Sequence, residues 1–343
     1  MAKILVTGGT GYIGSHTVVE LQEKGMEVVI VDNLSNSERS VLDGIRSISG
    51  IEAMFEEVDL RKREATFGVF EKHPDIQAII HFAAFKAVGE SVEKPLDYYE
   101  NNLLSLIHLL EAMRKYGVDH MVFSSSCTVY GEPDSLPVGE SAPIKVANSP
   151  YGNTKQICEE ILRDTVASME GKGVISLRYF NPIGAHESAL IGELPIGIPN
   201  NLVPFITQTA AGIRECLSVY GDDYNTPDGS AIRDYINVVD LARAHVVAIL
   251  RLLEGKQKSD FEVFNLGTGR GLSVLEVILA FEKVTGQALN YKVVNRREGD
   301  IEKVYADTSF ANAELGWKAE KGIEESLRSA WEWEKKIRAQ KGN

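Results

Sequence analysis

The chain has 343 residues, of which 44% are hydrophobic and 25% charged, and its formal net charge is −13. This composition is ordinary for a globular protein, and the length allows two domains or one large α/β unit with an insertion. The negative charge argues against nucleic acid or an anionic membrane as the main partner. No apolar run approaches the ~20 residues needed to cross a bilayer.

The cysteines argue against a structural metal site or a disulfide framework. Cys127, Cys158 and Cys216 are odd in number and stand at unrelated spacings. The start of the chain, MAKILVTGG, has a short apolar part that runs straight into glycines, which favours an opening strand over a signal peptide. We therefore expect a protein of the reducing cytoplasm that holds no metal.

The first half of the chain alternates short apolar runs with amphipathic stretches. Strands are predicted at residues 3–8, 27–32, 53–59, 78–84, 120–126 and 174–180, with helices at 12–24, 60–72 and 101–116. Repeated βα units form right-handed crossovers, so the pattern predicts an α/β fold with a doubly wound parallel sheet.

After Asn181 the chain becomes rich in Pro and Gly, which suits a connection into a second unit. A strand at 235–239, a helix at 240–253 and a strand at 261–266 then predict a return to the first sheet. Ser273 and Glu276 form a capping-box pattern before a helix at 274–284. The predicted domains are 1–180 plus about 235–266, and a smaller, non-contiguous α/β domain of about 181–234 plus 267–343.

A glycine-rich segment, TGGTGYIGSH at 7–16, lies between the first predicted strand and the first helix. Gly9, Gly11 and Gly14 fit G-x-G-x-x-G, and Gly8 adds an earlier glycine. Such a turn lets the backbone and a helix N-terminus approach a pyrophosphate. Asp32, 18 residues after Gly14, can accept hydrogen bonds from ribose hydroxyls and would repel a 2′-phosphate, which favours NAD over NADP. The alternative is a glycine turn without a ligand.

A second glycine cluster, 267–271, has no matching acidic residue. The prediction there is a strand-to-helix turn.

The segment YGNTK places Tyr151 and Lys155 four residues apart, on one face of a helix. An ammonium beside a phenol favours the phenolate, so the pair can move a proton. Ser126 follows an apolar strand, at the edge where open α/β sheets bind ligands, and can share a hydrogen bond with a substrate hydroxyl. The alternatives are an ordinary helix start for the pair and loop capping for the serine.

These segments, together with RYFNP, RDYI and RREGD, resemble the extended short-chain dehydrogenase/reductase family, and within it the nucleotide-sugar 4-epimerases. The resemblance covers nearly the whole chain. It implies reversible 4-epimerisation of UDP-galactose and UDP-glucose through a 4-keto intermediate, with NAD held tightly and regenerated in each cycle. It assigns catalysis to Ser126, Tyr151 and Lys155.

The resemblance also implies two sets of binding residues, one for NAD and one for the UDP-sugar. The NAD set is Gly8, Gly11, Tyr12, Ile13, Gly14, Asp32, Asn33, Asn36, Ser37, Asp59, Leu60, Phe82, Ala83, Lys86, Asn101, Ser124, Tyr151, Lys155 and Phe180. The UDP-sugar set is Lys86, Ser126, Thr128, Tyr151, Asn181, Asn201, Leu202, Ser218, Val219, Tyr220, Arg233, Arg297, Asp300 and Val304. Two arginines suit a pyrophosphate, although for either one alone a surface ion pair is the alternative.

Two features of the sequence bear on substrate specificity: the residue pair after Ser126 and the residue at position 304. Cys127 and Thr128 stand where the related 4,6-dehydratases have an acidic pair, so elimination of water lacks its acid and base. Val304 aligns with a residue beside the sugar 2-position, where a tyrosine is associated with excluding N-acetyl groups. Because valine is small, we hypothesise that UDP-GlcNAc and UDP-GalNAc are also interconverted.

The resemblance further implies a homodimer formed by the helices at 101–116 and 151–165, the alternative being their burial within one chain. Other functions weighed are a decarboxylase, an epimerase of another sugar, and a redox sensor without catalysis. Such sensors commonly lack the tyrosine–lysine pair.

Overall fold

The computed structural model describes residues 2–297 and 300–341, without the side chains of residues 340 and 341. By its internal contacts the chain forms two compact units. The first comprises Met1–Glu132, Glu140–Tyr179 and Ala242–Phe264; the second comprises Pro133–Gly139, Phe180–Leu241 and Asn265–Asn343.

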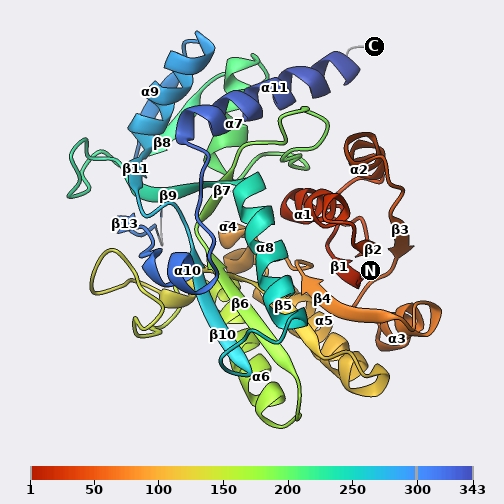
Figure 1. Ribbon diagram of the computed structural model, residues 1–343. Helices are drawn as coiled ribbons and strands as arrows, with labels where there is room; N and C mark the ends of the chain where they lie inside the picture. Colours follow the sequence, from red (N-terminus) through yellow and green to blue (C-terminus); the bar gives the residue numbers. More distant parts are fainter. Residues whose placement is uncertain (1, 298–299, 342–343) are drawn as a thin grey trace. The chain divides into compact units, whose positions relative to one another are not determined.

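The first unit is an α/β sandwich (Figure 1). Its elements are β1 (Lys3–Thr7), α1 (Tyr12–Glu23), β2 (Glu27–Asp32), α2 (Val41–Ser49), β3 (Met54–Glu57), α3 (Arg63–Lys72), β4 (Ile76–His81), α4 (Val88–Glu93), α5 (Pro95–Tyr116), β5 (His120–Ser126), the 3-10 helix η1 (Cys127–Tyr130), α6 (Pro150–Ala167), β6 (Gly173–Tyr179), most of α8 (Val238–Leu253) and most of β10 (Phe261–Leu266).

In the described residues these strands form one seven-stranded sheet in the order β10-β6-β5-β4-β1-β2-β3. From β1 to β6 the neighbouring strands pair in parallel. The apolar runs at residues 4–6 of β1 and 78–80 of β4 are fully buried, as expected for a parallel sheet that is covered on both faces. The prediction of a doubly wound parallel sheet is confirmed.

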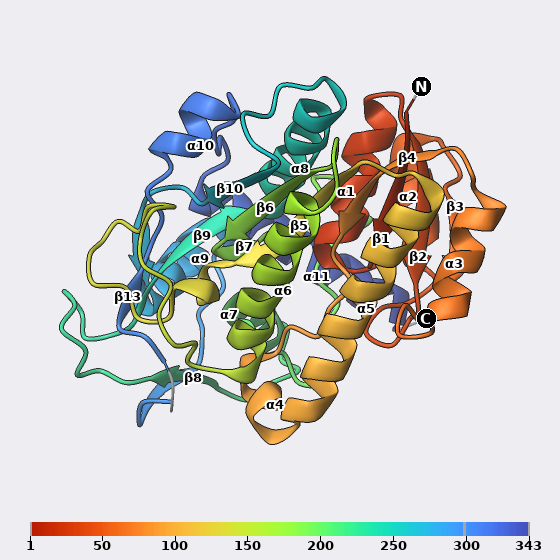
Figure 2. The same cartoon turned by 90° about the horizontal axis from the view of Figure 1, so that it is seen from below.

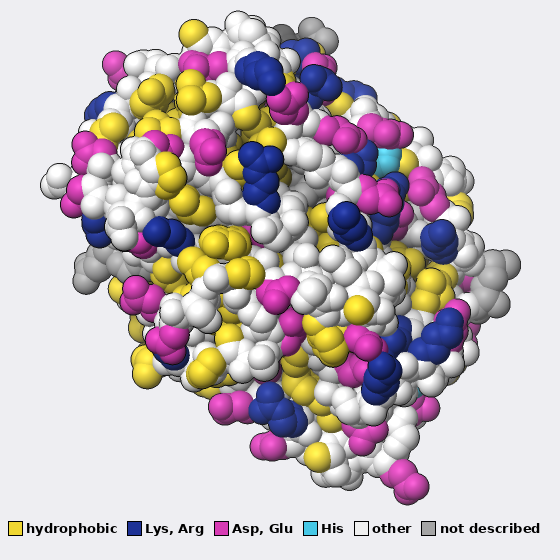
Figure 3. Space-filling model, turned by 60° about the vertical axis from the view of Figure 1, so that its left-hand side comes forward, with side chains coloured by type: hydrophobic (Ala, Val, Ile, Leu, Met, Phe, Trp, Pro, Cys, Tyr) yellow, Lys and Arg dark blue, Asp and Glu magenta, His cyan; other side chains and the backbone are white. Residues whose placement is uncertain are grey.

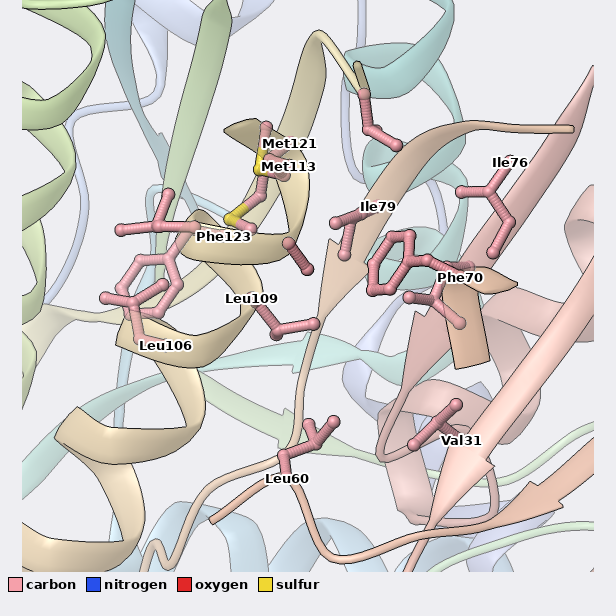
Figure 4. Close-up of a cluster of buried hydrophobic side chains, with 14 of the residues drawn as sticks. Val31, Leu60, Phe70, Ile76, Ile79, Leu106, Leu109, Met113, Met121 and Phe123 are labelled. Atoms are coloured by element: carbon pink, nitrogen blue, oxygen red, sulfur yellow. The ribbon is translucent and has the colours of Figure 1, made fainter. Parts of the chain in front are cut away.

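One face of this sheet packs on α3, α5 and α6 (Figure 4). Phe70 of α3 and Leu106 and Leu109 of α5 pack with Ile79 of β4 and Phe123 of β5, and all five are nearly inaccessible to solvent. Figure 2 shows α5 and α6 side by side along this layer. The core therefore fixes α6, the helix that begins with Pro150 and Tyr151.

The second unit is smaller and assembled from separate stretches of chain. Its remaining elements are β7 (Asn181–Ile183), α7 (Leu202–Ala210), β8 (Leu217–Tyr220), β9 (Ile232–Asn237), β11 (Gly271–Ser273), α9 (Val274–Thr285), β12 (Tyr291–Val294), β13 (Lys303–Val304), α10 (Ser309–Glu314) and α11 (Ile323–Lys341). Strand β9 pairs with β7, β11 and β13, and β8 pairs with β12. Helices α7, α9 and α11 enclose a core that includes Ile206, Phe281 and Leu327.

The predicted capping box is present. Ser273 accepts from the Glu276 N–H, and the Glu276 carboxylate accepts from the Ser273 N–H, at the start of α9. The paired bonds satisfy two N–H groups of the first turn, and they fix where the preceding glycine-rich loop ends.

The structure differs from the sequence prediction in two places. The strand expected at 235–239 is β9, which lies in the sheet of the second unit and not in the seven-stranded sheet; only 261–266 joins the latter. The apolar pattern and the length of the segment 235–239 suit a strand of either sheet, so the sequence could not show which sheet this segment joins. Residues 133–139 also belong to the second unit, where Val138 exchanges backbone hydrogen bonds with Tyr305 and Asp307.

Candidate active site

The glycine-rich turn after β1 has the close packing expected of a cradle for a pyrophosphate. A Cβ on Gly14 would lie 2.2 Å from the carbonyl oxygen of Gly8, and Gly8 itself has a φ of 68°. Helix α1 starts after Gly11 with no side-chain cap and no acidic residue in its first turn. Its first N–H groups are therefore available to an anion, and the residues present fit a dinucleotide.

Asp32 ends β2 and organises the loop that follows it. Its carboxylate accepts hydrogen bonds from the Thr10 N–H at 3.3 Å, the Leu34 N–H at 2.9 Å and the Ser37 hydroxyl at 3.2 Å. The Ser37 hydroxyl also bonds to the Thr10 hydroxyl at 2.7 Å. Asp32 thus links the glycine turn to the β2–α2 loop, where Asn33 is partly buried and Asn36 exposed.

The other residues of the predicted NAD set in the first unit follow the same edge of the sheet. Asp59 and Leu60 follow β3, and Arg61 lowers the pKa of Asp59 through a bidentate ion pair. Further members are Ile13 and Tyr12 in α1, Phe82 and Ala83 after β4, Lys86 with its ammonium 6.0 Å from the Tyr12 ring centroid, and the buried Asn101 on α5. Carboxyl ends of parallel strands form the ligand edge of such sheets.

Ser126 and Tyr151 come together at the end of β5. Ser126 is the last residue of β5 and caps η1, accepting from the Thr128 N–H at 3.2 Å. Tyr151 lies in the first turn of α6 and is buried. Burial raises the pKa of the Tyr151 phenol, and a hydrogen bond with Ser126 lowers it by less. The chain's own groups therefore hold this phenol in the protonated form.

Lys155 lies one turn further along α6 and is also buried. Its ammonium donates to the Ser124 carbonyl at 2.6 Å and lies 4.7 Å from the centroid of the Phe123 ring. Burial lowers the pKa of Lys155 to about 8. The side chain of Ser124 shares a short hydrogen bond with Tyr179, whose pKa burial raises to about 12.

Thr128 has a hydroxyl group that could pair with a ligand. Its hydroxyl oxygen is buried and has no hydrogen-bond partner among the described residues. Neither Thr128 nor the neighbouring Cys127 supplies a carboxylate beside Ser126. An unsatisfied buried hydroxyl is costly, so a ligand group that pairs with it is stabilised.

In the second unit the structure brings both predicted arginines to one carboxylate. Asp300 accepts from Arg297 at 2.7 Å and 3.2 Å, and lies 3.6 Å from Arg233. Arg233 also donates to the Ile232 carbonyl at 2.9 Å. The two guanidiniums are therefore held beside one carboxylate, and guanidiniums are suited to bidentate binding of phosphate groups. Residues 298 and 299, the middle of the RREGD segment, lie outside the described residues.

Val304 and Tyr220 adjoin this arginine pair. Val304 of β13 stands opposite Arg233 of β9 and is buried. The Arg297 guanidinium lies 5.6 Å from the centroid of the Tyr220 ring, and Tyr220 ends β8, which also carries Ser218 and Val219. Five predicted substrate residues, Tyr220, Arg233, Arg297, Asp300 and Val304, are thus neighbours.

The other predicted residues of the second unit lie on adjoining elements. Asn181 starts β7, and Phe180 before it donates its N–H to the Leu266 carbonyl. Asn201 precedes α7 without a side-chain cap hydrogen bond, and Leu202 begins the helix. The Asn201 amide donates to the Glu193 carboxylate at 2.5 Å.

Asp234 was not predicted from the sequence, although it holds the second glycine-rich loop in place. Its buried carboxylate accepts from the Thr268 N–H and hydroxyl and from the N–H groups of Gly269 and Ala306, at 2.6–3.2 Å. A Cβ on Gly267 would lie 2.4 Å from this carboxylate. The second glycine cluster is therefore a loop around an internal carboxylate, and an acidic residue inside the apolar-flanked RDYI segment was the available signal.

Sequence analysis also missed the buried ion pair of Glu159 and Arg178. Glu159 lies at i+4 from Lys155 on α6, and Arg178 lies inside the apolar strand β6. Their side chains are both 4% exposed and are joined by hydrogen bonds of 2.5 Å and 2.9 Å. A charged residue within a buried strand was the signal that could have found the pair.

Similarity to known proteins shows the family to which this chain belongs. The family model described as GDP-mannose 4,6 dehydratase matches residues 5–330. The UDP-glucose 4-epimerase of Bacillus subtilis (strain 168) is 52% identical over 331 residues, which are 96% of either chain. This chain belongs to the UDP-glucose 4-epimerase family. Its prediction as an extended short-chain dehydrogenase/reductase is confirmed.

Two solved structures of this epimerase family match over nearly their full length. The Stenotrophomonas maltophila enzyme, with bound NAD and formylated UDP-arabinopyranose, is 47% identical, with a TM-score of 0.95 and coverage of 99% of this chain and 100% of that one. The Bifidobacterium longum enzyme, in complex with NAD+ and UDP, is 46% identical, with a TM-score of 0.94 and coverage of 98% and 99%.

The surface carries charges of both signs. On the face in Figure 3, basic and acidic side chains are interspersed with apolar ones. In the part of the chain that the structure describes, no helix has the length and apolarity to span a bilayer.

Proposed function

We propose that this chain catalyses the reversible, NAD-dependent 4-epimerisation of UDP-galactose and UDP-glucose. The observation that carries the proposal is the set Ser126, Tyr151 and Lys155, buried at the edge of the sheet that also carries the Gly8–Gly14 cradle. Near 50% identity to UDP-glucose 4-epimerases over almost the whole chain supports the substrate class.

In this mechanism Tyr151 takes the proton of the sugar 4-hydroxyl and later returns it, while Ser126 shares a hydrogen bond with the same hydroxyl. NAD held on the Gly8–Gly14 cradle would supply the hydride acceptor and donor for sugar carbon 4, and its positively charged ring would favour the phenolate of Tyr151. Lys155 adds a second positive charge beside the phenol and holds the end of β5 through Ser124. Burial raises the pKa of the Tyr151 phenol, and positive charge placed near the phenol lowers it.

The first test is proton NMR of purified protein with UDP-galactose and no added cofactor. Appearance of UDP-glucose, with no net change in nicotinamide redox state, is the expected result. If UDP-galactose stays intact even after NAD is added, the substrate assignment is wrong. Full turnover by Tyr151→Phe would remove Tyr151 from the mechanism.

A dehydratase is the alternative that the description of the family model suggests. The two positions after Ser126 hold Cys127 and Thr128, so no acid–base pair for removing water is present there. The geometry thus supports epimerisation, and a 4-keto-6-deoxy product in the same NMR spectrum would overturn that choice.

Activity on UDP-GlcNAc and UDP-GalNAc is a second proposal, carried by Val304. Its side chain is buried next to Arg233 and is much smaller than that of a tyrosine. Val304→Tyr should lower kcat/KM for UDP-GlcNAc relative to UDP-glucose by tenfold or more. An unchanged ratio would remove Val304 as the determinant.

A homodimer in the cytoplasm completes the proposal. Val92 and Leu96 are exposed on α4 and α5, and Leu104 on α5 is partly exposed, although α5 and α6 also bury apolar residues within the chain. Three free thiols suit a reducing compartment. Light scattering that gives the mass of a monomer at micromolar concentration would exclude the stable dimer.

A further inference from the structure

One face of α6 makes a ladder of three contacts to the end of β5. Tyr151, Lys155 and Glu159 stand at intervals of four residues, which places them on one side of the helix. Tyr151 bonds to the Ser126 side chain, Lys155 to the Ser124 carbonyl and Glu159 to the Ser125 hydroxyl at 2.6 Å. Three successive serines of the strand are thus held by three successive turns of the helix.

Glu159 is the member of this ladder that reaches the most elements. Besides Ser125 of β5, its carboxylate accepts from Ser176 of β6 at 2.8 Å and from Arg178 of β6 at 2.9 Å. Arg178 stands directly opposite Ser125 in the strand pairing, and it donates to the Tyr130 hydroxyl of η1 at 3.0 Å. One ion pair therefore joins α6, β5, β6 and η1.

We propose that Glu159, paired with Arg178, is a positioning residue that sets the register of α6 against β5, so that Tyr151 meets Ser126 and Lys155 meets Ser124. The inference rests on the proposed function, because it takes Ser126, Tyr151 and Lys155 as the catalytic set. Apolar residues would fill the same space at lower desolvation cost, whereas a carboxylate that accepts directed bonds from two strands fixes the helix in one position.

The charge of Glu159 also acts on Lys155. Burial lowers the pKa of Lys155, and the negative charge of Glu159 offsets part of that effect. Among the described residues, the other ionisable groups near the ladder are His81 on β4, Cys127 and Tyr130 on η1, Tyr98 on α5 with its partner Glu90 on α4, Tyr179 and Arg178 on β6, and Cys158 on α6. Loss of the Glu159 charge leaves the Arg178 charge unbalanced, which destabilises the Lys155 ammonium further.

The test is steady-state epimerisation of UDP-galactose by purified, NAD-containing protein as a function of pH. Glu159→Gln should lower kcat at least tenfold, change KM less than threefold and move the alkaline limb of the kcat profile to lower pH. Glu159→Asp keeps the charge but shortens the side chain; it should lower kcat while leaving that limb in place. A purely structural role would not separate these two variants.

Glu262→Gln is the matched control, because Glu262 is also a buried partner of an arginine, Arg251, at 2.7 Å, between β10 and α8. It should retain the kcat and pH profile of the wild type. If Glu159→Gln matches Glu262→Gln in both, the inference is wrong although the proposed function stands. If the wild type itself does not epimerise, the proposed function fails instead.

Ser125→Ala covers the case in which Glu159→Gln does not fold. It removes one bond of the ladder and keeps the ion pair, so the protein should fold and lose at least threefold in kcat with KM unchanged. Wild-type kcat in folded Ser125→Ala would overturn the positioning of β5 by Glu159.

Discussion

Glu159 in the first unit and Asp234 in the second are both buried carboxylates beside proposed site residues, but they are held in opposite ways. Burial raises the pKa of Glu159, yet the bonds and charge of Arg178 outweigh it, so the pKa is lowered overall. Asp234 accepts four hydrogen bonds from neutral groups, and burial still raises its pKa. At Asp234 the hydrogen bonds from neutral groups position the carboxylate but do not outweigh burial, whereas at Glu159 the cation Arg178 acts together with the bonds from Ser125 and Ser176.

The largest loss of stability should follow from breaking the ion pair of Glu159 and Arg178. Glu159→Leu leaves the Arg178 guanidinium buried without a counter-charge, and about 3–5 kcal/mol of unfolding free energy should be lost. Urea denaturation measures this loss. The double variant Glu159→Leu/Arg178→Met should recover most of it, and a double variant as unstable as the single one would contradict the explanation.

Asp234→Asn should have a smaller effect, because an amide keeps the shape and replaces only one acceptor oxygen. In either orientation its NH₂ faces groups that need an acceptor, so we expect a loss of about 1–3 kcal/mol. Since Ala306 lies two residues after Val304, the ratio of kcat/KM for plain and N-acetylated sugars should change as well. The control is Asp43→Asn, whose side chain is 75% exposed, and equal losses in both would contradict the role of Asp234.

The two carboxylates should also give opposite pH dependences of stability. The lowered pKa of Glu159 contributes stability that is present above its unfolded value of 4.5 and is lost as the pH falls through the folded value. The raised pKa of Asp234 contributes stability below 3.8 that is lost as the pH rises through the folded value. Each slope is limited to about 1.4 kcal/mol per pH unit.

Urea midpoints of the wild type, Glu159→Gln and Asp234→Asn from pH 3.5 to 6.5 measure these slopes. The advantage of the wild type over Glu159→Gln should grow with pH, and its advantage over Asp234→Asn should shrink. Slopes of the same sign would mean that the two sites do not differ in charge stabilisation.

The smallest effect should come from Tyr130→Phe, which removes the 3.0 Å hydrogen bond to Arg178 and keeps the ring. Arg178 retains its bonds to Glu159, so a loss of about 0.5–1.5 kcal/mol is expected. Thermal unfolding measures it, with Tyr116→Phe as control, since the Tyr116 hydroxyl bonds to the exposed Glu71 at 2.7 Å and not to a buried charge. A loss as large as that of Glu159→Leu would show that Tyr130 is the main partner of Arg178.

Patterns that are local in the sequence predicted most of the first unit. The strand expected at 120–126 is β5, and the helix expected after Pro150 is α6, because buried parallel strands are continuous apolar runs and Pro marks a helix start. The same local logic found the glycine turn and the spacing of Tyr151 and Lys155.

Contacts between distant segments were not predictable in this way. The strand expected at 235–239 was placed in the main sheet, but as β9 (Ile232–Asn237) it pairs with β7, β11 and β13, because its apolar pattern fits either sheet. Asp234 was not identified either, since its donors come from residues 268, 269 and 306. A single sequence shows neither pairing.

The segment 133–139 depends on partners that are synthesised much later than the segment itself. Val138 accepts from Asn265, 127 residues later in the chain, and pairs with Ala306, which is made later still. At a synthesis rate of roughly 5–20 residues per second, this delay is on the order of 10 s. During that interval the polypeptide between η1 and α6 has left the ribosome without these partners. A nascent chain can therefore already carry Ser126, Tyr151 and Lys155 while the connection between η1 and α6 has not yet reached its native structure.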